Sequence, residues 1–297
     1  MLRIGFIGLG KMGRHMAENM YSHGAEIKVF DAIPKVLEDV HANGIPVASS
    51  SAEIGNWADL IFLSLPNANV IDSVLFGTNG VISENTAKNM TVIDLGTTAY
   101  IKTLEFAKRL NKLGFGYADA PVSGMESRAK SGELTLMYGG TKDIFDKAYP
   151  YFEMISNKIL NFGNLGSGQM AKLVNQLLFD INAAALGEIL ALAGELGLDP
   201  QKTVELVNSG TGRSWASEFF APKIIEGNFS EGYAMGNAYK DIVSANEISA
   251  QLQLPMPILA AATAIYQMAL KMGTSNEGKG AMIKVYEKIY GVNFRKK

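Results

Sequence analysis

The sequence predicts an α/β protein in which a doubly wound, mostly parallel sheet is followed by an all-α domain. Two observations support this prediction. Up to residue 162, short apolar runs alternate with helix-like segments, as a parallel sheet requires because helices cross over between its strands. From Gln169 onward, apolar residues recur only with helical spacing. We therefore expect domains at residues 1–164 and 165–297, joined by a long helix that begins at Gln169 and ends near Leu196.

Residues 3–31 form the most informative stretch. Its parts follow in the order strand, glycine turn, helix, strand and acid: Ile4–Ile7, Gly8-x-Gly10-x-x-Gly13, Lys11–His23, Ile27–Phe30 and Asp31. Gly8 permits a sharp turn, Gly10 leaves room for a pyrophosphate, and Gly13 lets the helix pack close to the strand. Free N–H groups at the helix start then face the phosphates. The stretch predicts a Rossmann-type dinucleotide site built on Gly8, Leu9, Gly10, Lys11, Met12 and Gly13.

The acid at the end of the second predicted strand bears on the choice of cofactor. The Asp31 carboxylate can accept hydrogen bonds from both ribose hydroxyls and repels a 2′-phosphate, which predicts NAD over NADP. Lys35 could approach a 2′-phosphate, and a lysine at this position favours NADP. A competing interpretation, the phosphate loop of nucleotide hydrolases, requires Ser or Thr after Gly10-Lys11, where this chain has Met12.

Further strands are predicted where apolar residues cluster between turn signals. These strands lie near Val47 and at 59–64, 91–95, 115–118, 134–139 and 159–162. Helices are expected between these strands at 33–43, 66–75 and 142–154. A further short helix is expected after 49–51, which would cap it together with Glu53, and another after Thr98, which would cap a helix that ends near Leu113. The helical domain continues with helices that start at Asp199-Pro200 and cover 214–225, 238–252, 258–272 and 280–290.

Polar or glycine-rich turns follow the predicted parallel strands at 8–13, 64–67, 96–98 and 121–124. The carboxyl ends of parallel strands meet at one edge of a sheet, and ligands bind there in open α/β folds. We therefore expect these turns to line one crevice, which the helical domain closes.

Composition argues against several classes of protein. The net charge of −2 provides no field for nucleic acid or an anionic membrane. No uninterrupted apolar run reaches the roughly 18 residues of a membrane helix. The chain has no cysteine, which excludes disulfides, thiolate nucleophiles and Cys-ligated zinc. The N-terminus enters a strand at once, so we expect no signal or transit peptide and a cytoplasmic protein.

The three histidines, His15, His23 and His41, all fall on or beside the first two predicted helices, where surface positions are expected. No cluster of His, Asp and Glu has metal-ligand spacing, so no metal site is predicted. If the predicted dinucleotide site belongs to an alcohol dehydrogenase, the enzyme needs a base beside the nicotinamide, and no histidine is placed for that role. Lysine is then the obvious candidate.

Several stretches, spread over almost the whole chain, match one family of enzymes. They are GFIGLGKMGRHMAENM (5–20), SLPN (64–67), VIDLGTT (92–98), DAPVSG with GELTLMYGG (119–124 and 132–140), GSGQMAKLVNQLL (166–178) and KD (240–241). In these stretches the chain resembles the β-hydroxyacid dehydrogenases, which include 3-hydroxyisobutyrate dehydrogenase, tartronate semialdehyde reductase and, more distantly, 6-phosphogluconate dehydrogenase. Their number, order and spacing make the resemblance specific, whereas any one alone would be weak evidence.

The resemblance implies which residues carry the reaction. Lys172, early on the long helix, resembles the family's catalytic lysine, which transfers a proton to or from the substrate hydroxyl. A nicotinamide cation and partial burial both favour its neutral amine. Asn175, on the same helix face, resembles the asparagine that holds the substrate. Ser123 and Gly124 resemble the loop that grips the substrate carboxylate. The structural alternatives are that Lys172 is a surface lysine, that Asn175 is an ordinary polar helix residue, and that Ser123 and Gly124 form a turn between strands.

The resemblance also implies residues that border the cofactor or enclose the substrate: Leu65, Pro66 and Thr97 toward the cofactor, Trp215 toward the substrate, and Lys240 toward both. Asp241 would support Lys240, and Tyr233 would border the nicotinamide. Arg213 could pair with a second carboxylate or a phosphate, although a surface arginine at a helix start is at least as ordinary an explanation.

Two residues depart from the family pattern. Met125 stands where a second glycine is usual, and its bulk is expected to narrow or reshape the site for the carboxylate. Gly96 stands where the family tends to have serine, before Thr97, so one hydroxyl is missing. These departures concern the identity of the substrate rather than the chemistry.

The resemblance implies an NAD-dependent oxidoreductase that transfers a hydride between nicotinamide and a small β-hydroxyacid or its semialdehyde. One alternative is an imine reductase of the same architecture, but such enzymes typically lack a lysine at the position of Lys172. Another is a non-catalytic dinucleotide-binding or sensing protein, against which Lys172, Asn175 and Ser123 together argue. We expect a small carboxylate substrate, neither nucleic acid nor membrane as partner, and a homodimer or homotetramer formed through the apolar helices.

Overall fold

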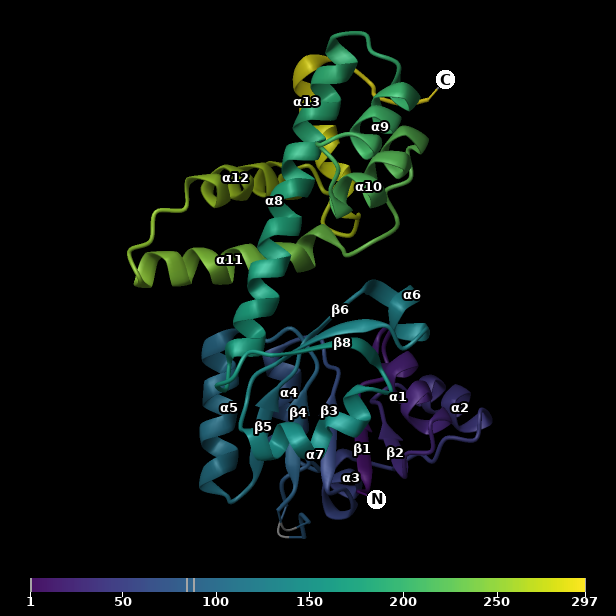
Figure 1. Ribbon diagram of the computed structural model, residues 1–297, viewed down its shortest axis with the longest axis vertical. Coiled ribbons are helices and arrows are strands. Elements are labelled where there is room, and N and C mark those ends of the chain that lie inside the picture. The colour runs from purple at the N-terminus through teal and green to yellow at the C-terminus, as the bar shows by residue number, and fades with distance from the viewer. Residues whose placement is uncertain (1, 84, 88, 297) are drawn as a thin grey trace. The chain divides into compact units, whose positions relative to one another are not determined.

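The computed structural model describes residues 2–83, 85–87 and 89–296 (Figure 1). By internal contacts the chain divides into two compact units, Met1–Lys172 and Leu173–Lys297. The division falls inside helix α8 (Ser167–Glu195), which contributes to both units. The domain boundary expected between residues 164 and 165 lies just before this helix and stays a prediction.

The first unit is built on a five-stranded parallel sheet. Its strands are β1 (Ile4–Ile7), β2 (Ile27–Phe30), β3 (Leu60–Leu63), β4 (Thr91–Asp94) and β5 (Gly116–Asp119), in the order β2-β1-β3-β4-β5. The chain runs from β1 to β2 and then crosses to β3 on the other side of β1, so the winding reverses at β1. A ligand crevice is expected at such a reversal, beyond the carboxyl end of the strand. The predicted fold class is confirmed.

Helices cover both faces of this sheet. They are α1 (Gly13–Ser22), α2 (Pro34–Ala42) and α7 (Lys142–Phe152) on one face and α3 (Ser51–Trp57), α4 (Ala68–Phe76) and α5 (Tyr100–Lys112) on the other. Met16, Val40 and Phe152 lie in the core on the first face, and Ile54 and Leu75 lie in the core on the second. Because β1, β3 and β4 are buried along their whole length, they read as apolar runs rather than as alternating patterns.

A small second sheet follows the fifth strand. It contains β6 (Val122–Ser123), β7 (Leu134–Tyr138) and β8 (Ser156–Asn161), with β6 antiparallel and β8 parallel to β7. A bridge between Asp119 and Gly139 connects it to β5. The strands expected at 134–139 and 159–162 therefore exist, but they form a sheet of their own. The short helix α6 (Met125–Lys130), which the sequence pattern did not indicate, lies between β6 and β7.

Two local predictions are wrong for identifiable reasons. Thr98 does not cap α5, which starts after Ala99 without a side-chain cap. Thr98 Oγ1 instead donates to Asp94 Oδ2 at 2.6 Å, because a hydrogen bond to a carboxylate is stronger than one between neutral groups. The strand expected near Val47 is reduced to a single bridge with Val29, since the chain turns away after one residue pair.

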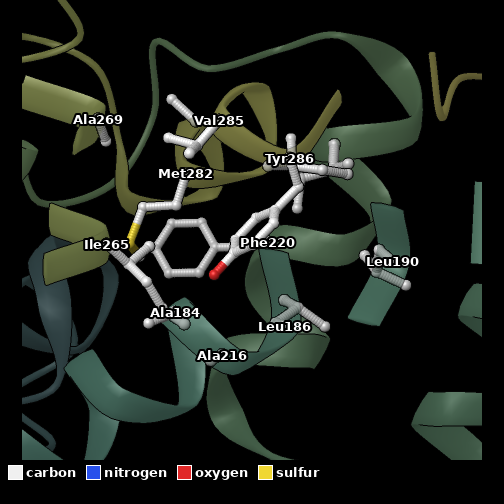
Figure 2. Close-up of a cluster of buried hydrophobic side chains, with 14 of the residues drawn as sticks. Ala184, Leu186, Leu190, Ala216, Phe220, Ile265, Ala269, Met282, Val285 and Tyr286 are labelled. Atoms are coloured by element: carbon white, nitrogen blue, oxygen red, sulfur yellow. The ribbon is translucent and has the colours of Figure 1, made fainter. Parts of the chain in front are cut away.

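Apart from a single β-bridge between Ala234 and Gly278, the regular structure in the described residues of the second unit is helical. After α8 it contains α9 (Pro200–Ser209), α10 (Trp215–Glu226), α11 (Met235–Gln251), α12 (Pro257–Lys271), the 3₁₀ helix η1 (Lys279–Met282) and α13 (Ile283–Tyr290). Figure 2 shows part of the core of this unit, where side chains from α8, α10, α12 and α13 come together, among them Ala184, Phe220, Ile265 and Tyr286. The helix expected at 280–290 is divided: its first residues, up to Met282, belong to the 3₁₀ helix, and the α-helix starts at Ile283.

Among the described residues, α8 is the helix long and apolar enough to cross a membrane, with a mean hydropathy of 1.6 in its most apolar window. It meets this criterion on average hydropathy although its sequence has no uninterrupted apolar run of that length. Half of the window (50%) is buried inside the protein. Core helices of soluble proteins pass the same test, so this finding is weak evidence for a membrane span.

A buried ion pair ties α8 to the C-terminal part of the second unit. Lys279 of η1 contacts Asp180 of α8, and both side chains are 0% exposed. The ammonium of Lys279 lies 4.0 Å from the ring centroid of Phe179 and 5.6 Å from that of Tyr233, within range of cation–π attraction. Burial raises the pKa of Asp180 to about 6 although the lysine opposes this shift, and burial lowers the pKa of Lys279.

Candidate active site

The glycine turn after β1 has the geometry that close approach of a pyrophosphate requires. Gly8 has a φ of +98°, and a Cβ there would meet Ser64 O at 2.3 Å. A Cβ on Gly13 would lie 1.9 Å from Gly8 O, so only glycine allows α1 to start against the turn. Gly10 is exposed and a Cβ there would have no atom within 4 Å. Because α1 begins without a side-chain cap, its first N–H groups suit an anion.

Asp31 lies at the end of β2, beside the glycine turn. Its Oδ2 accepts the Leu9 N–H at 2.7 Å and its Oδ1 accepts the Ile33 N–H at 2.9 Å, which fixes the carboxylate in place. Lys35, on α2, is 74% exposed and pairs with Asp39 at 3.0 Å. The cation that could favour a 2′-phosphate is therefore already partnered by a carboxylate on its own helix.

The carboxyl ends of neighbouring strands place the predicted turns along one edge of the sheet. The last residues of β1, β3, β4 and β5 are register partners in that order: Ile7, Leu63, Asp94 and Asp119. The turn residues Leu65, Pro66 and Thr97 follow β3 and β4 directly, with Pro66 and Thr97 exposed. The structure thus brings the glycine turn and the turns after β3 and β4 together.

Gly96, where the family tends to have serine, lies in a restricted position. A Cβ there would be 3.0 Å from Asp94 Oδ1 and 3.1 Å from Leu65 O. A serine would therefore require neighbouring atoms to give way by a few tenths of an ångström. The serine hydroxyl that the family tends to have is absent at position 96, and the turn at this position packs closely around glycine.

A buried polar network holds the turn after β4 against the start of α8. Gln169, 3% exposed, accepts the Thr98 N–H at 3.0 Å through Oε1 and donates through Nε2 to Gly96 O at 2.8 Å. On the other side, Asp94 accepts the Gly96 N–H at 2.9 Å and the Thr98 hydroxyl at 2.6 Å. The loop that contains Thr97 is therefore fixed from two directions.

Asp119, the last residue of β5, fixes the start of α8. Its Oδ1 accepts the Gly166 N–H at 2.6 Å and its Oδ2 accepts the Gln169 N–H at 2.7 Å. The Gly166 N–H lies just before the helix and the Gln169 N–H in its first turn, where N–H groups lack intrahelical acceptors and a negative charge is favourable. A Cβ on Gly168 would lie 2.3 Å from Met137 O, so the helix start is also packed tightly against β7.

Burial raises the pKa of both carboxyls. The pKa of Asp94 is raised to about 6 by desolvation, against the lowering effect of its bonds from Thr98 and Gly96. Desolvation likewise raises the pKa of Asp119 to about 6, although the N–H groups of Gly166 and Gln169 oppose it. The folded protein therefore binds these protons more tightly than the unfolded chain does.

We expect Asp94→Asn to change how stability depends on pH. The Asp94 pKa is about 6 in the folded state against 3.8 in the reference state, so between these values the folded state binds more protons. The contribution of Asp94 to the free energy of unfolding then falls as the pH rises from about 4 to about 6 and is constant above that. Urea unfolding at about pH 4.5, 5.5 and 7 should show the variant gaining stability relative to wild type across this window. A pH-independent difference would contradict the assignment.

Lys172 lies in the second turn of α8 and is 7% exposed. It comes one helical turn after Gln169, so the contacts that fix the helix start also fix the backbone that carries Lys172. Asn175 follows one turn later and is exposed. By contacts Lys172 is the last residue of the first unit and Asn175 belongs to the second.

Ser123 and Gly124 lie at the junction between β6 and α6. Ser123 is the register partner of Thr135 on β7. Gly124 has a φ of +146°, and a Cβ there would lie 3.0 Å from Arg128 Cβ. Met125 has a φ of +62°, a left-handed conformation that favours glycine. The chain thus keeps a glycine-type backbone at the position where the family usually has glycine, while adding a long side chain.

In the second unit, the predicted substrate residues come from three helices. Gln176 of α8 donates from Nε2 to Asp241 Oδ2 of α11 at 3.3 Å. Asn175 precedes Gln176 and Lys240 precedes Asp241, so this bond brings the backbones of the two predicted residues near each other. Trp215, 54% exposed, is the first residue of α10.

Asp94, Asp119 and Gln169 are the residues of this site that sequence reasoning misses. All three occur inside matching motifs, but nothing local marks Asp119 and Gln169 as partners. The available signal is positional, because a polar residue that ends a fully buried strand must find a hydrogen-bond partner.

Known proteins resemble the chain over nearly its whole length. Residues 3–163 match the sequence model for the NAD binding domain of 6-phosphogluconate dehydrogenase, and residues 166–286 match that for the NAD-binding domain of NADP-dependent 3-hydroxyisobutyrate dehydrogenase. 2-(Hydroxymethyl)glutarate dehydrogenase of Eubacterium barkeri is 36% identical over 293 residues, covering 98% of this chain and 97% of that protein. 2-Hydroxy-3-oxopropionate reductase of Escherichia coli (strain K12) is 30% identical over 286 residues, covering 96% and 97%.

Solved structures agree with this similarity. A crystal structure of 3-hydroxyisobutyrate dehydrogenase from Salmonella typhimurium has a TM-score of 0.88 and 26% sequence identity, covering 96% of this chain and 100% of that one. An imine reductase from Pseudomonas sp. has a TM-score of 0.59 and 18% identity, covering 96% and 99%. The second comparison shows a common fold alone.

The glycine turn at the carboxyl edge of a doubly wound sheet, with the two matching sequence models, defines a nicotinamide-dinucleotide-dependent oxidoreductase. The chain belongs to the β-hydroxyacid dehydrogenase family. It is therefore a dehydrogenase or reductase that acts on the CH–OH group of a small hydroxyacid.

Proposed function

We propose that this enzyme transfers a hydride between NAD(H) and a small β-hydroxyacid or the matching semialdehyde, with Lys172 as general acid and base. The observation that carries the proposal is the placement of Lys172. It is a buried lysine one turn after the point where Asp119 and Gln169 fix α8 to the carboxyl edge of the sheet. Family membership supports the assignment, because position 172 matches the family's catalytic lysine.

The proposed chemistry divides between the cofactor and the side chain. When bound, the nicotinamide accepts the hydride during oxidation and supplies it during reduction. During oxidation the neutral Nζ of Lys172 accepts the proton of the substrate hydroxyl while the C–H bond breaks, which leaves a carbonyl. During reduction the ammonium returns the proton to the carbonyl oxygen as the C–H bond forms.

We assign substrate binding to Ser123, Gly124, Asn175, Lys240 and Trp215. The Ser123 hydroxyl and the N–H groups around Gly124 would hold the carboxylate, and the Asn175 amide would orient the hydroxyl. The ammonium of Lys240 would add positive charge toward the carboxylate, and the Trp215 ring would exclude water. These roles follow from the family resemblance and from the chemistry of each side chain.

The test is steady-state turnover of a panel of acids with NAD and NADP. The panel contains 3-hydroxyisobutyrate, 3-hydroxypropionate, glycerate, 4-hydroxybutyrate, 2-(hydroxymethyl)glutarate and threonate, with the matching aldehydes tested for reduction. A preference for one acid with NAD would support the proposal. Absence of turnover with every acid, despite tight NADH binding, would contradict it.

The two alternatives fit the chain less well. An imine reductase shares the fold, but Lys172 stands at a position where those enzymes typically have no lysine. A non-catalytic dinucleotide-binding protein would not need Lys172, Asn175 and Ser123 together. Turnover of cyclic imines without turnover of hydroxyacids would favour the first alternative.

We propose NAD as the preferred cofactor because Asp31 is fixed at the end of β2 by Leu9 and Ile33. Asp31→Asn removes the charge and keeps an acceptor, so we expect the ratio of kcat/KM with NADP to that with NAD to rise roughly tenfold, equivalent to about 1.4 kcal/mol. Lys35→Ala is the control and should leave the ratio unchanged, since Lys35 already pairs with Asp39. Wild-type turnover with NADP alone would refute this assignment.

We also propose that the enzyme forms a homodimer or homotetramer through α8. One face of this helix leaves large apolar side chains exposed, namely Val174, Leu178, Ile189 and Leu192. Light scattering should give a mass that is a multiple of the 32.0 kDa chain, and Ile189→Glu should reduce it. A monomeric wild-type protein at all concentrations would contradict this prediction. The cytoplasmic location likewise stays a prediction.

A further inference from the structure

We propose that Gln169 is a positioning residue for the reaction. Its side-chain amide clamps the Gly96–Thr98 loop to the first turn of α8, and this clamp fixes the position of Thr97 relative to Lys172. The proposal rests on the function proposed above. It adds a residue that touches neither substrate nor cofactor but holds together two elements that do.

The amide of Gln169 is used at both ends. Its Oε1 accepts from Thr98 N at 3.0 Å and its Nε2 donates to Gly96 O at 2.8 Å. The two contacts lie on either side of Thr97, so the amide brackets that residue as a neighbouring strand would. The pairing also fixes which end of the amide is oxygen, since an N–H can bond only to an acceptor.

The clamp is rigid because both of its ends are held elsewhere. The backbone N–H of Gln169 donates to Asp119 Oδ2 at 2.7 Å, which anchors the clamp to β5. Asp94 holds the loop through the Gly96 N–H and the Thr98 hydroxyl. Gln169 is 3% exposed and both aspartates are 0% exposed, so water does not replace these bonds.

Gly96 explains why the loop needs hydrogen bonds from the Gln169 side chain. Glycine allows the backbone more conformations than any other residue, and Gly96 has no side chain with which to fix the loop. Hydrogen bonds from outside must then supply the order. Since Lys172 comes one turn after Gln169 on the same helix, the amide transmits the position of α8 directly to the loop beside it.

The experiment compares wild type with Gln169→Leu, which keeps a side chain of similar size and loses both hydrogen bonds. We expect kcat for the best acid of the panel to fall roughly 10–100-fold, because misplacing a reacting group by about 1 Å costs up to ~10²-fold. NADH affinity and the KM for the acid should change little, since the glycine turn and Ser123 are untouched. Hydrogen exchange should accelerate at the amides of residues 96–99.

Two further variants separate positioning from general destabilisation. Leu110→Ala opens a cavity in α5, away from the loop, and should lower the melting temperature while leaving kcat near wild type. Thr98→Val removes the bond to Asp94, so the double variant with Gln169→Leu should lose less kcat than the product of the single losses. Fully multiplicative losses would mean that the two bonds act independently, and would overturn the proposal.

Three other outcomes would also overturn the proposal. They are a Gln169→Leu variant with wild-type kcat, unchanged exchange at residues 96–99, and an equal loss of kcat in Leu110→Ala. Failure of the proposed function would look different, because wild type itself would then turn over no hydroxyacid. The clamp would in that case be judged by the exchange of residues 96–99 in the same samples, where faster exchange in Gln169→Leu alone supports it.

Discussion

Lys172→Ala is expected to lower kcat by about 10²–10⁴-fold, the range that a positioned acid–base group contributes. NADH should still bind, because the glycine turn and Asp31 do not involve the lysine. The measurement is steady-state kinetics with the best acid of the panel, together with fluorescence titration of NADH. Loss of turnover with retained binding would also distinguish an enzyme from a protein that only binds the dinucleotide.

Three comparisons make this prediction specific. Lys172→Arg should be inactive as well, because a guanidinium keeps its proton at any working pH. Small primary amines should restore part of the activity of Lys172→Ala by occupying the space of the missing side chain. Lys202→Ala, at an exposed position on α9, should behave as wild type. A Lys172→Ala variant that keeps a tenth or more of the wild-type kcat would rule out the proposed role.

Lys279→Met is expected to lower the free energy of unfolding by about 3–5 kcal/mol, because it leaves the buried Asp180 carboxylate without its partner. The loss should be smaller below about pH 6 than at pH 7, because removing Lys279, which lowers the pKa of Asp180, lets that carboxyl of the variant take up a proton and become neutral as the pH falls. Urea unfolding at both pH values measures the two effects.

The double variant Lys279→Met/Asp180→Leu is expected to recover most of this stability, since replacing a whole buried pair with apolar groups is often neutral. Lys284→Met provides a matched control. Lys284 pairs with Glu277 in the same part of the chain, but the two side chains are 29% and 34% exposed. Its loss should be below about 1 kcal/mol. Equal losses in Lys279→Met and Lys284→Met would show that burial does not set the cost.

The main sheet could be predicted because its central strands are buried on both faces. Strands such as Ile4–Ile7 and Leu60–Leu63 read as short apolar runs, and the helices between them show their own period. The second sheet could not be assigned from the same pattern. Its first strand, Val122–Ser123, is too short to show any period. A local sequence pattern also does not indicate which strands pair with one another.

The glycine turn could be predicted because its physical requirements lie within a few consecutive residues. The network around Gln169 could not, since its partners are 50 to 73 residues away along the chain. Thr98 shows a different limit. Its sequence position suggests a helix cap, but its hydroxyl donates to the Asp94 carboxylate four residues earlier, and the sequence pattern does not show which of the two local roles it takes. Local pattern therefore predicts the elements, and long-range hydrogen bonds complete the site.

The cap that Asp119 provides for α8 has a consequence for the order of folding. The carboxylate and the Gly166 N–H that it accepts are 47 residues apart, so this contact forms only after a long loop has closed. The C-terminal half of the helix, around Leu186 and Leu190, packs into the hydrophobic core of the second unit. We expect that half to gain protection from hydrogen exchange before β5 has docked, and the first turn to gain it afterwards. One continuous helix would thus report two separate stages of folding.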